Sequence, residues 1–311
     1  MSQNEMMTRR EFVAAAAACG VTAAFADADG DGYRPEIVRD TVDLGLGKPF
    51  RMLHASDTHI CGFYASEAAG LSEKMRVRRE IYWKYWEKSL PAQLAYAKDN
   101  GLPILHTGDL IDFASFANIA EAKRFFAAAD VFACVGNHEF GCSGNDLRVT
   151  KMLLDAFWPN EISIASRVVN GVNFVAFDNS RYALTSWTTE RLRAEFRKNL
   201  PTVLLCHIPF YEPSLHGVSI GDHWKKAGTS YLLGVPRAIC ETYPDWARKE
   251  QAPTEETMDN LETLRKEPNL RAILTGHLHF PFSSRFSPTA MQYVCGCGGY
   301  RHGQLREITF C

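Results

Sequence analysis

Residues 103–112 read PILHTGDLID, a short apolar run that ends in a glycine and two aspartates. A run of about four to eight apolar residues bounded by turn residues is typical of a strand buried inside a sheet. The same pattern predicts buried strands at 50–55, 131–135, 172–177, 202–206 and 271–274. Stretches rich in Ala, Leu, Glu, Lys and Arg predict helices at 71–100, 115–129, 145–157 and 188–199. This alternation indicates an α/β layered domain.

The last third of the chain departs from this rhythm. After residue 274, apolar residues recur at Phe286, 291–294 and 306–310, separated by Pro and Gly, which predicts antiparallel strands that close a second sheet. One domain of two packed sheets, spanning 49–311, is the simplest interpretation. The segment 209–269 carries six prolines and several aromatic residues, so we interpret it as an insert that forms a lid or a binding loop. A surface excursion without function is the alternative.

Composition excludes several classes of protein. The chain has 311 residues, of which 46% are hydrophobic and 23% charged, as in ordinary globular proteins. Its formal net charge is −2, so we expect no nucleic-acid patch. After the N-terminal region, no stretch approaches the ~20 continuous apolar residues that cross a bilayer, which predicts no transmembrane segment.

The first 28 residues have the pattern of an export signal. Arg9 and Arg10 precede an alanine-rich stretch and then Ala26-Asp27-Ala28, which matches a small-residue cleavage site. The paired arginines resemble the twin-arginine signal of proteins that fold before export. A general secretory signal, a helix start, or a lipid-attachment site at Cys19 are the alternatives. We therefore expect a periplasmic or cell-envelope protein that meets the export machinery, with 29–48 as a linker.

The nine cysteines carry less information. In an oxidising compartment they permit disulfides, and we expect one or two besides buried thiols. The chain has no CxxC pair, which argues against a structural zinc site. Cys61, Cys134 and Cys206 lie near polar motifs, but neighbours on a strand point to opposite faces, so we interpret all three as packing residues.

Five polar blocks each follow a predicted strand. They are Asp57-Thr58-His59, Gly108-Asp109-Leu110-Ile111-Asp112, Gly136-Asn137-His138-Glu139, Cys206-His207 and Gly276-His277-Leu278-His279. Loops at the carboxyl ends of strands gather active-site groups in α/β folds. In an extended segment, residues two apart point the same way, so Asp57 with His59, and His277 with His279, would each present two metal ligands. The glycines let the backbone turn sharply and approach the cluster.

This ordered set resembles the calcineurin-like metallophosphoesterase family, whose pattern is DxH, GDxxD, GNHE, a lone His and GHxH. The resemblance runs from about Arg51 to His279. It implies a four-layer fold in which two mixed sheets lie between helices. It also implies two metal ions that share Asp109. The expected ligands are Asp57, His59, Asp109 and His279 for one ion, and Asp109, Asn137, His207 and His277 for the other.

The resemblance also implies a chemistry. Two divalent ions outweigh the charges of Asp57 and Asp109, so the site keeps positive charge for a phosphate. Imidazole and oxygen ligands without thiolate suit Mn, Fe or Zn. A metal-bound hydroxide would attack phosphorus directly, without a covalent phosphoenzyme. His138 would contact the phosphate and protonate the leaving group, a purely structural role being the alternative. Asp112 would orient a ligand histidine, and Glu139 would do likewise or simply start the following loop.

Residues on the substrate side are harder to assign. Asn179 and Arg181 follow a predicted strand, and the guanidinium of Arg181 matches phosphate geometry. Four further candidates lie in the insert: Tyr211, His216, His223 and Trp224. Solvated surface is the alternative for all of these positions.

The predicted function is hydrolysis of a phosphodiester or a small organic phosphomonoester, with a small molecule or a lipid head group as substrate. The metal cluster does not separate diesters from monoesters, and we favour a diester or a small organic phosphate. A purple acid phosphatase is disfavoured, because Asp112 stands where its iron-binding tyrosine is expected. The alternatives from other classes are a metal-binding protein without catalysis and an interaction protein that uses the metal core as a scaffold.

Overall fold

The computed structural model describes residues 35–311 except 68–72, 84, 142–146 and 301–302. The predicted export signal at 1–28, with Cys19, lies outside these residues. Within them, no helix is long and apolar enough to cross a membrane. All seven described cysteines are free, and six of them are buried, so the disulfides expected from the sequence do not form among them.

One sheet has five strands in the order β1-β11-β2-β3-β4. These are β1 (Glu36–Val42), β2 (Phe50–Ala55), β3 (Ile104–Thr107), β4 (Val131–Cys134) and β11 (Gln304–Phe310). Strands β2, β3 and β4 run parallel, whereas β11 is antiparallel to β2 and parallel to β1. The first strand lies within 29–48, the segment predicted to be a linker. It was missed because its residues are largely exposed or half-buried at the sheet edge and form no continuous apolar run.

The other sheet has six strands in the order β5-β6-β7-β8-β10-β9. These are β5 (Ile164–Val169), β6 (Val172–Phe177), β7 (Thr202–Leu205), β8 (Leu270–Thr275), β9 (Phe282–Arg285) and β10 (Met291–Val294). The prediction that the last strands are antiparallel and close this sheet was only partly right. Strand β10 runs parallel to β8 and antiparallel to β9, while β11 belongs to the five-stranded sheet.

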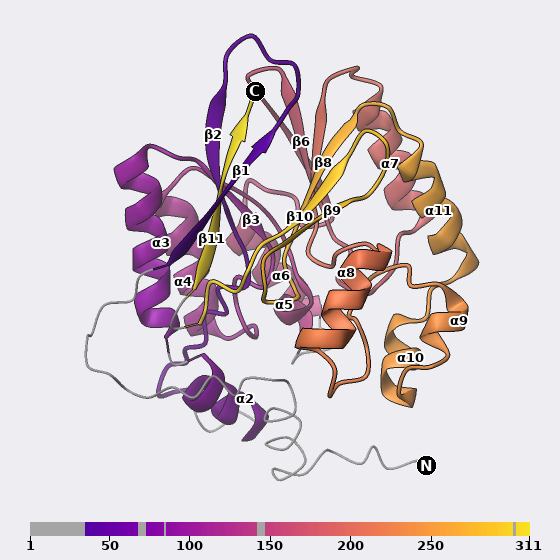
Figure 1. Ribbon diagram of the computed structural model, residues 1–311. Helices are drawn as coiled ribbons and strands as arrows, with labels where there is room; N and C mark the ends of the chain where they lie inside the picture. The colour runs from indigo at the N-terminus through magenta and orange to yellow at the C-terminus, as the bar shows by residue number, and fades with distance from the viewer. Residues whose placement is uncertain (1–34, 68–72, 84, 142–146, 301–302) are drawn as a thin grey trace.

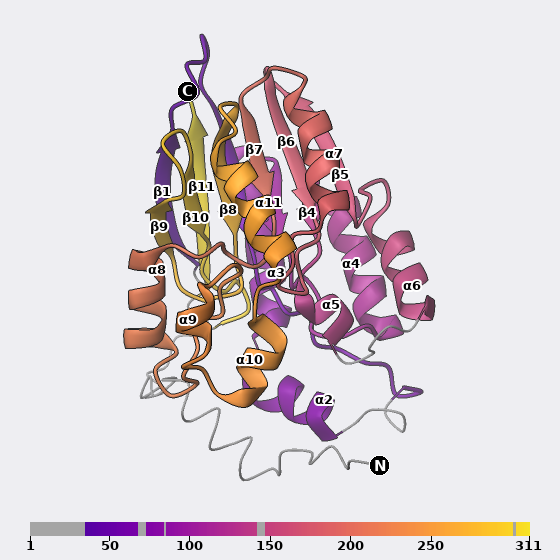
Figure 2. The same cartoon turned by 90° about the vertical axis from the view of Figure 1, so that its right-hand side faces the viewer.

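The two sheets pack face to face and helices cover both outer faces (Figures 1 and 2). Met52 and Leu105 from one sheet meet Phe174 and Leu205 from the other in the central core. Helices α3 (Trp86–Asn100), α4 (Phe116–Ala128) and α6 (Leu147–Phe157) cover the five-stranded sheet, and α7 (Ser186–Phe196) and α11 (Glu255–Arg265) the six-stranded one. The predicted four-layer α/β/β/α sandwich is confirmed.

The helix expected over 71–100 is interrupted. It begins as α2 (Glu73–Val77), continues as a π-helical turn, η2 (Arg78–Tyr82), and resumes as α3. The break falls at Trp83, whose indole is 3% exposed and turns inward to stack on the imidazole of His59. Burial of this large aromatic ring under the motif loops stabilises the fold more than continuation of the helix would.

The segment predicted as an insert is mostly helical. It contains α8 (Pro213–Val218), the π-helical turn η3 (Ser219–His223), α9 (Arg237–Cys240), α10 (Asp245–Gln251) and α11. Helix α11 belongs to the outer helical layer, so it is not a surface excursion. The others gather at the end of the sandwich where α2 and α5 (Asn137–Gly141) also lie (Figure 1). Leu215 and Leu232 share a small core there with Leu278 and Phe280.

Candidate metal centre

The five polar blocks follow β2, β3, β4, β7 and β8 and meet at one end of the sandwich. In the first half of the cluster, Nε2 of His59 lies 3.3 Å from Nε2 of His279. Oδ1 of Asp57 lies 3.2 Å from the same nitrogen of His279 and 3.7 Å from that of His59. Three ligand atoms from β2 and β8 loops thus converge on one point. We refer to these three residues as position 1.

The second half has the same form. Nδ1 of His277 lies 3.2 Å from Nε2 of His207. Oδ2 of Asp109 lies 3.1 Å from Nε2 of His207 and 3.9 Å from Nε2 of His59, so this carboxylate stands between the two halves. Asn137 opens α5, directly after β4 and Gly136. We refer to Asn137, His207 and His277 as position 2.

Every ligand histidine has its other ring nitrogen engaged. Nδ1 of His59 contacts Asp112 Oδ1 at 3.0 Å, and Nδ1 of His207 contacts the Thr107 carbonyl oxygen at 2.7 Å. The remaining two contact tyrosine hydroxyls: His277 Nε2 contacts Tyr182 at 2.7 Å, and His279 Nδ1 contacts Tyr300 at 3.0 Å. Such outer partners fix the tautomer and orientation of metal-binding imidazoles. Four rings are therefore held with one nitrogen pointing into the cluster.

Two buried oxygens of this cluster make no hydrogen bond, Asp57 Oδ1 and Asn137 Oδ1. A buried polar atom without a partner is costly, and each is explained by an ion that it would ligate. Both oxygens belong to predicted ligands, one in each position. Imidazole and oxygen donors suit first-row transition metals. The residues present thus fit two cations, one at each position, with Asp109 shared.

The sequence predicted extended motif loops, but the backbone of these loops is not extended. The backbone φ angle is positive at Asp57 (52°), His59 (48°), Asp109 (51°), His277 (69°) and His279 (62°). A non-glycine residue in this region costs roughly 1–3 kcal/mol and is held there by its surroundings. In the first loop, the Asp57 and His59 N–H groups donate to the carbonyl oxygens of Gly108 and Asp109. Backbone strain is thus concentrated at the residues that present ligands.

Close approach explains two of the motif glycines. A Cβ on Gly276 would overlap Oγ of Ser56 and Oδ2 of Asp57. One on Gly136 would overlap Oδ1 of Asp109. Any side chain at these positions would displace a predicted ligand carboxylate.

Protons compete with cations for the nitrogens of this cluster. Burial lowers the pKa of His59, but Asp112 and Asp57 outweigh it and raise the pKa to about 9. For His207, burial is likewise outweighed, here by Asp109, and the pKa rises to about 10. Burial and the neighbouring His207 lower the pKa of His277 to about 3. Burial raises the pKa of Asp109, yet His207 and His138 bring it well below its usual value.

Asp112 is the hub of the outer contacts around position 1. Its Oδ1 lies 3.0 Å from Nδ1 of both His59 and His138. The guanidinium of Arg78 reaches both carboxylate oxygens. Burial raises the pKa of Asp112, and the Arg78 charge outweighs this and holds it well below its usual value. The role of Arg78 could not be predicted from the sequence, because Arg78 lies in a helical turn outside every motif.

His138 faces the cluster without being part of either position. Its backbone N–H donates to Asp109 Oδ1 at 2.8 Å, and its Nε2 lies 3.9 Å from Asp109 Oδ2. The side chain is 23% exposed, whereas Asp109 is fully buried. This imidazole therefore borders both the ligand cluster and solvent.

Glu139 does not orient a ligand histidine. Its buried carboxylate accepts the backbone N–H groups of Asp109, Ile111 and Gly136 at 2.6–3.1 Å. Burial and the nearby Asp109 charge raise its pKa to about 7. It therefore joins the loop after β3, which carries Asp109, to the loop after β4, which carries Asn137.

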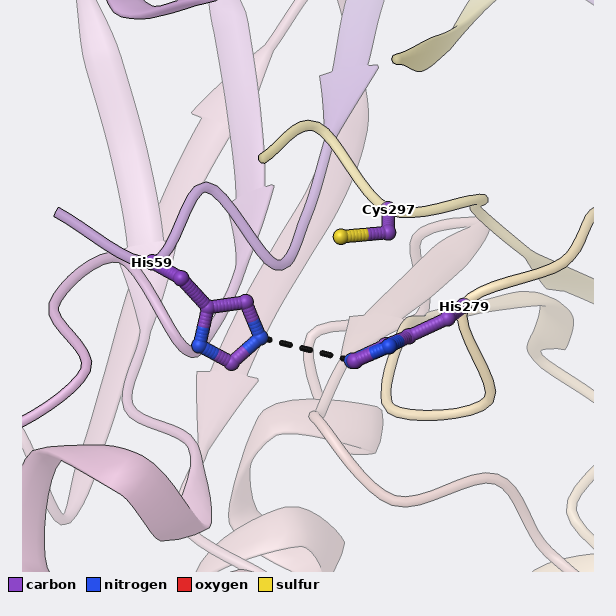
Figure 3. A group of neighbouring side chains, drawn as sticks. All are labelled: His59, His279 and Cys297. Carbon is purple, nitrogen blue, oxygen red and sulfur yellow. Dashed lines mark hydrogen bonds between the residues drawn. The ribbon is translucent and has the colours of Figure 1, made fainter. Parts of the chain in front are cut away.

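A cysteine lies beside position 1. The Sγ of Cys297 and the facing nitrogens of His59 and His279 fall within 4.8 Å of one another, and Figure 3 shows the sulfur directed toward the gap between the two rings. The thiol donates to the Asp57 carbonyl oxygen at 3.2 Å, and burial raises its pKa well above its usual value. It packs with Cys61, Trp83 and Phe113. We interpret Cys297 as a packing thiol and keep the metal ligands to imidazole and oxygen.

The residues predicted to bind substrate differ in their burial and their contacts. Asn179 is buried and its Oδ1 accepts the N–H groups of His207 and Ile208, so it shapes a ligand loop. Arg181 is exposed. Tyr211 and His216 pack together, and His216 also contacts the hydroxyl of Tyr243.

Other parts of the insert approach the ligands. His223 stacks on Phe280, the residue after His279, with 3.7 Å between ring centroids. The Trp224 ring lies 6.3 Å from that of His279, and the Tyr231 ring 5.9 Å from that of His277. The insert thus borders the metal centre. Sequence reasoning did not predict three tyrosines near the ligands: Tyr182, Tyr231 and Tyr300. Their one signal was their position in segments that follow β6, β7 and β10.

The comparison with protein families agrees with this geometry. A family model described as calcineurin-like phosphoesterase matches residues 50–281, most of the chain. The chain belongs to the calcineurin-like phosphoesterase family. Among curated proteins, none matches the chain.

Several solved structures are similar to parts of this chain at low identity. A dimetal phosphatase from Danio rerio has 13% identity and a TM-score of 0.47, over 80% of this chain and 88% of that one. A candidate 5′-nucleotidase from Staphylococcus aureus has 16% identity and a TM-score of 0.45, over 81% of this chain and 49% of that one. Phosphopantetheinyl hydrolase from Mycobacterium tuberculosis has 13% identity and a TM-score of 0.38, over 83% and 90%.

Proposed function

We propose that this chain is a hydrolase that uses two metal ions to cleave a phosphate ester. The observation that carries the proposal is the pair of facing imidazole nitrogens in each position, with Asp109 between them. Core packing does not explain four imidazoles and two carboxylates that turn their donor atoms toward each other. When bound, two such ions supply an activated water and stabilise the entering and leaving oxygens of a displacement at phosphorus.

The ligand assignment follows the two positions. Asp57, His59 and His279 would hold one ion, and Asn137, His207 and His277 the other, with Asp109 shared. Mn, Fe and Zn fit this donor set equally. Only two carboxylates contribute, so the loaded site keeps positive charge and favours an anionic phosphate.

His138 supports hydrolysis over mere metal storage. It stands next to the ligand cluster, with its backbone fixed by Asp109 and its ring held by Asp112. A ring so placed can donate a proton to the departing alcohol, which typically contributes ~10² to 10⁴ in rate. His138 is not among the proposed ligands, and its Nε2, which lies 3.4 Å from a terminal nitrogen of Arg78, is the atom that would donate to the leaving group.

For the substrate we propose a phosphodiester or a small organic phosphomonoester, either a free small molecule or a lipid head group. The aromatic residues Trp224 and Tyr231, from the insert, lie close enough to His279 and His277 to contact the group attached to the phosphate. The export signal predicted at 1–28 supports a place in the cell envelope for this activity.

The test is metal content of the purified mature protein together with hydrolysis of bis-p-nitrophenyl phosphate and p-nitrophenyl phosphate. We expect about two ions per chain, as in dinuclear sites. Asp109→Ala is expected to lose both metal and activity, while His138→Ala keeps the metal and slows cleavage, most strongly for esters of weakly acidic alcohols.

Protein that binds no metal and stays inactive after addition of Mn, Fe or Zn would refute the proposal. Protein that binds two ions but cleaves neither ester would support the alternative of a metal-binding protein without catalysis. The ratio of the two wild-type rates ranks diester against monoester chemistry.

A further inference from the structure

One buried carboxylate serves two histidines with different tasks. Asp112 Oδ1 lies 3.0 Å from Nδ1 of His59, a proposed metal ligand, and 3.0 Å from Nδ1 of His138, the proposed proton donor. The two rings are nearly perpendicular, with centroids 4.8 Å apart. A single oxygen can contact both Nδ1 atoms only if the plane of the carboxylate is fixed.

Arg78 is the group that fixes this plane. Its Nε lies 2.5 Å from Asp112 Oδ2, and one terminal NH2 lies 2.6 Å from Oδ1. Two parallel N–H···O bonds from a planar fork restrain the carboxylate against rotation, which the point charge of a lysine does not do. The same terminal nitrogen lies 3.1 Å from Nδ1 of His138. The Arg78 side chain is 13% exposed, so solvent does little to weaken these contacts.

Arg78 is itself held in place. Its guanidinium carbon lies 5.8 Å from the ring centroid of Trp83, and this ring stacks on His59 at 3.7 Å and 9°. Asp112 and Trp83 therefore meet His59 from two directions, and Arg78 contacts both. The helix that carries Arg78 is placed by the turn at Trp83, so the arginine reaches the site from a segment outside every ligand motif.

We propose that Arg78 is a positioning residue: it orients the Asp112 carboxylate so that one oxygen aligns both the metal ligand His59 and the proton donor His138. This inference rests on the proposed function. It gives Arg78 two separable effects, one on metal affinity through His59 and one on proton delivery through His138. An arginine that only neutralised a buried carboxylate would stabilise the fold without distinguishing between substrates.

The experiment compares Arg78→Gln and Arg78→Lys with wild type on two esters that differ only in their alcohol. p-Nitrophenol is acidic enough to leave without a proton, whereas phenol is not. We expect Arg78→Gln to lose about 10- to 100-fold more in kcat on the phenyl ester than on the p-nitrophenyl ester, a part of the usual contribution of a general acid. Arg78→Lys keeps the charge but not the fork and is expected to show the same selective loss, smaller in size.

Metal titration provides the second readout. We expect both variants to bind the ion at position 2 as wild type does. The ion at position 1 should bind up to about 10- to 100-fold more weakly, as for other outer partners of ligand histidines. Arg76→Gln is the matched control, because Arg76 lies two residues earlier in α2, is 53% exposed, and pairs with Glu73. It is expected to match wild type in both assays.

The outcomes separate this inference from the proposed function. Equal losses on the two esters, or a lysine variant that matches wild type on both, would overturn the positioning role while leaving the enzyme established. A wild type that cleaves neither ester would overturn the proposed function and this inference with it. If Arg78→Gln does not fold, as judged by circular dichroism, the lysine variant decides.

Discussion

Position 1 and position 2 present the same kind of facing imidazoles but hold them differently. In the proposed assignment, position 1 uses two carboxylates, Asp57 and Asp109, whereas position 2 shares Asp109 and adds the neutral amide of Asn137. The outer partner of His59 is the carboxylate of Asp112, whereas that of His207 is a backbone carbonyl. A carboxylate partner makes a ligand imidazole more basic. We therefore expect position 1 to be the more strongly donating half and to bind its ion more tightly.

The largest effects on metal content and activity are expected when one proposed ligand is removed from each half. Asp57→Ala is expected to lose one ion and to slow hydrolysis by at least about 10²-fold, because several kcal/mol of charge stabilisation disappear. Asn137→Ala is expected to weaken metal binding less, since it removes no charge. Metal analysis and kcat measure both. Asp130→Ala, which removes an exposed carboxylate paired with Arg167, is the control and should match wild type.

Partial chelation tests the same difference without a substitution. Increasing chelator should remove the ion at position 2 first, leaving protein with one ion and little activity. Anomalous diffraction from crystals of the half-depleted protein would show which position is still filled. Density remaining beside His207 and His277, with none beside His59 and His279, would reverse the assignment.

The tyrosine partners give a finer comparison. Tyr182→Phe removes the hydroxyl that contacts His277, and Tyr300→Phe the one that contacts His279. Loss of such a partner typically lowers metal affinity about 10- to 100-fold. Each variant should weaken only its own half, which two-step metal titration can resolve. Equal weakening of both ions by either variant would mean that the halves are not independent.

The smallest effect is expected at Cys297. If the thiol only packs beside position 1, Cys297→Ser should keep two ions and a rate within roughly two-fold of wild type, or about 0.5 kcal/mol. A cobalt-substituted protein should then lack the absorption of a thiolate ligand in both forms. Loss of one ion in the serine variant would make the sulfur a ligand of position 1.

The cluster of candidate ligands could be located from the sequence because its members follow buried strands, most of them at a short spacing within a motif. Gly276, His277 and His279 illustrate this: the strand before them is a plain apolar run, and the glycine is required where a Cβ would strike Asp57. The alternation of buried strands and helices predicted an α/β layered domain, and the resemblance to the family implied its four layers. The apolar-run pattern missed β1 and β5, half-exposed edge strands without such a run.

The surroundings of the ligands could not be predicted in this way. Arg78, Trp83 and Tyr300 reach position 1 through tertiary packing of segments that contain no ligand, so no local spacing connects them with the metals. The left-handed backbone at His59 is likewise a product of the assembled loops. For Asn179, a polar residue after a strand, the structure shows a contact that the sequence did not indicate: its side chain holds the loop of His207.

The most direct test of the central claim is anomalous diffraction from crystals of the protein grown with Mn or Zn. We predict two ions roughly 3.5–4 Å apart, as in other two-metal sites. One should touch Asp57, His59 and His279, the other Asn137, His207 and His277, and both should touch Asp109. A single ion, or two ions that do not share Asp109, would contradict the account.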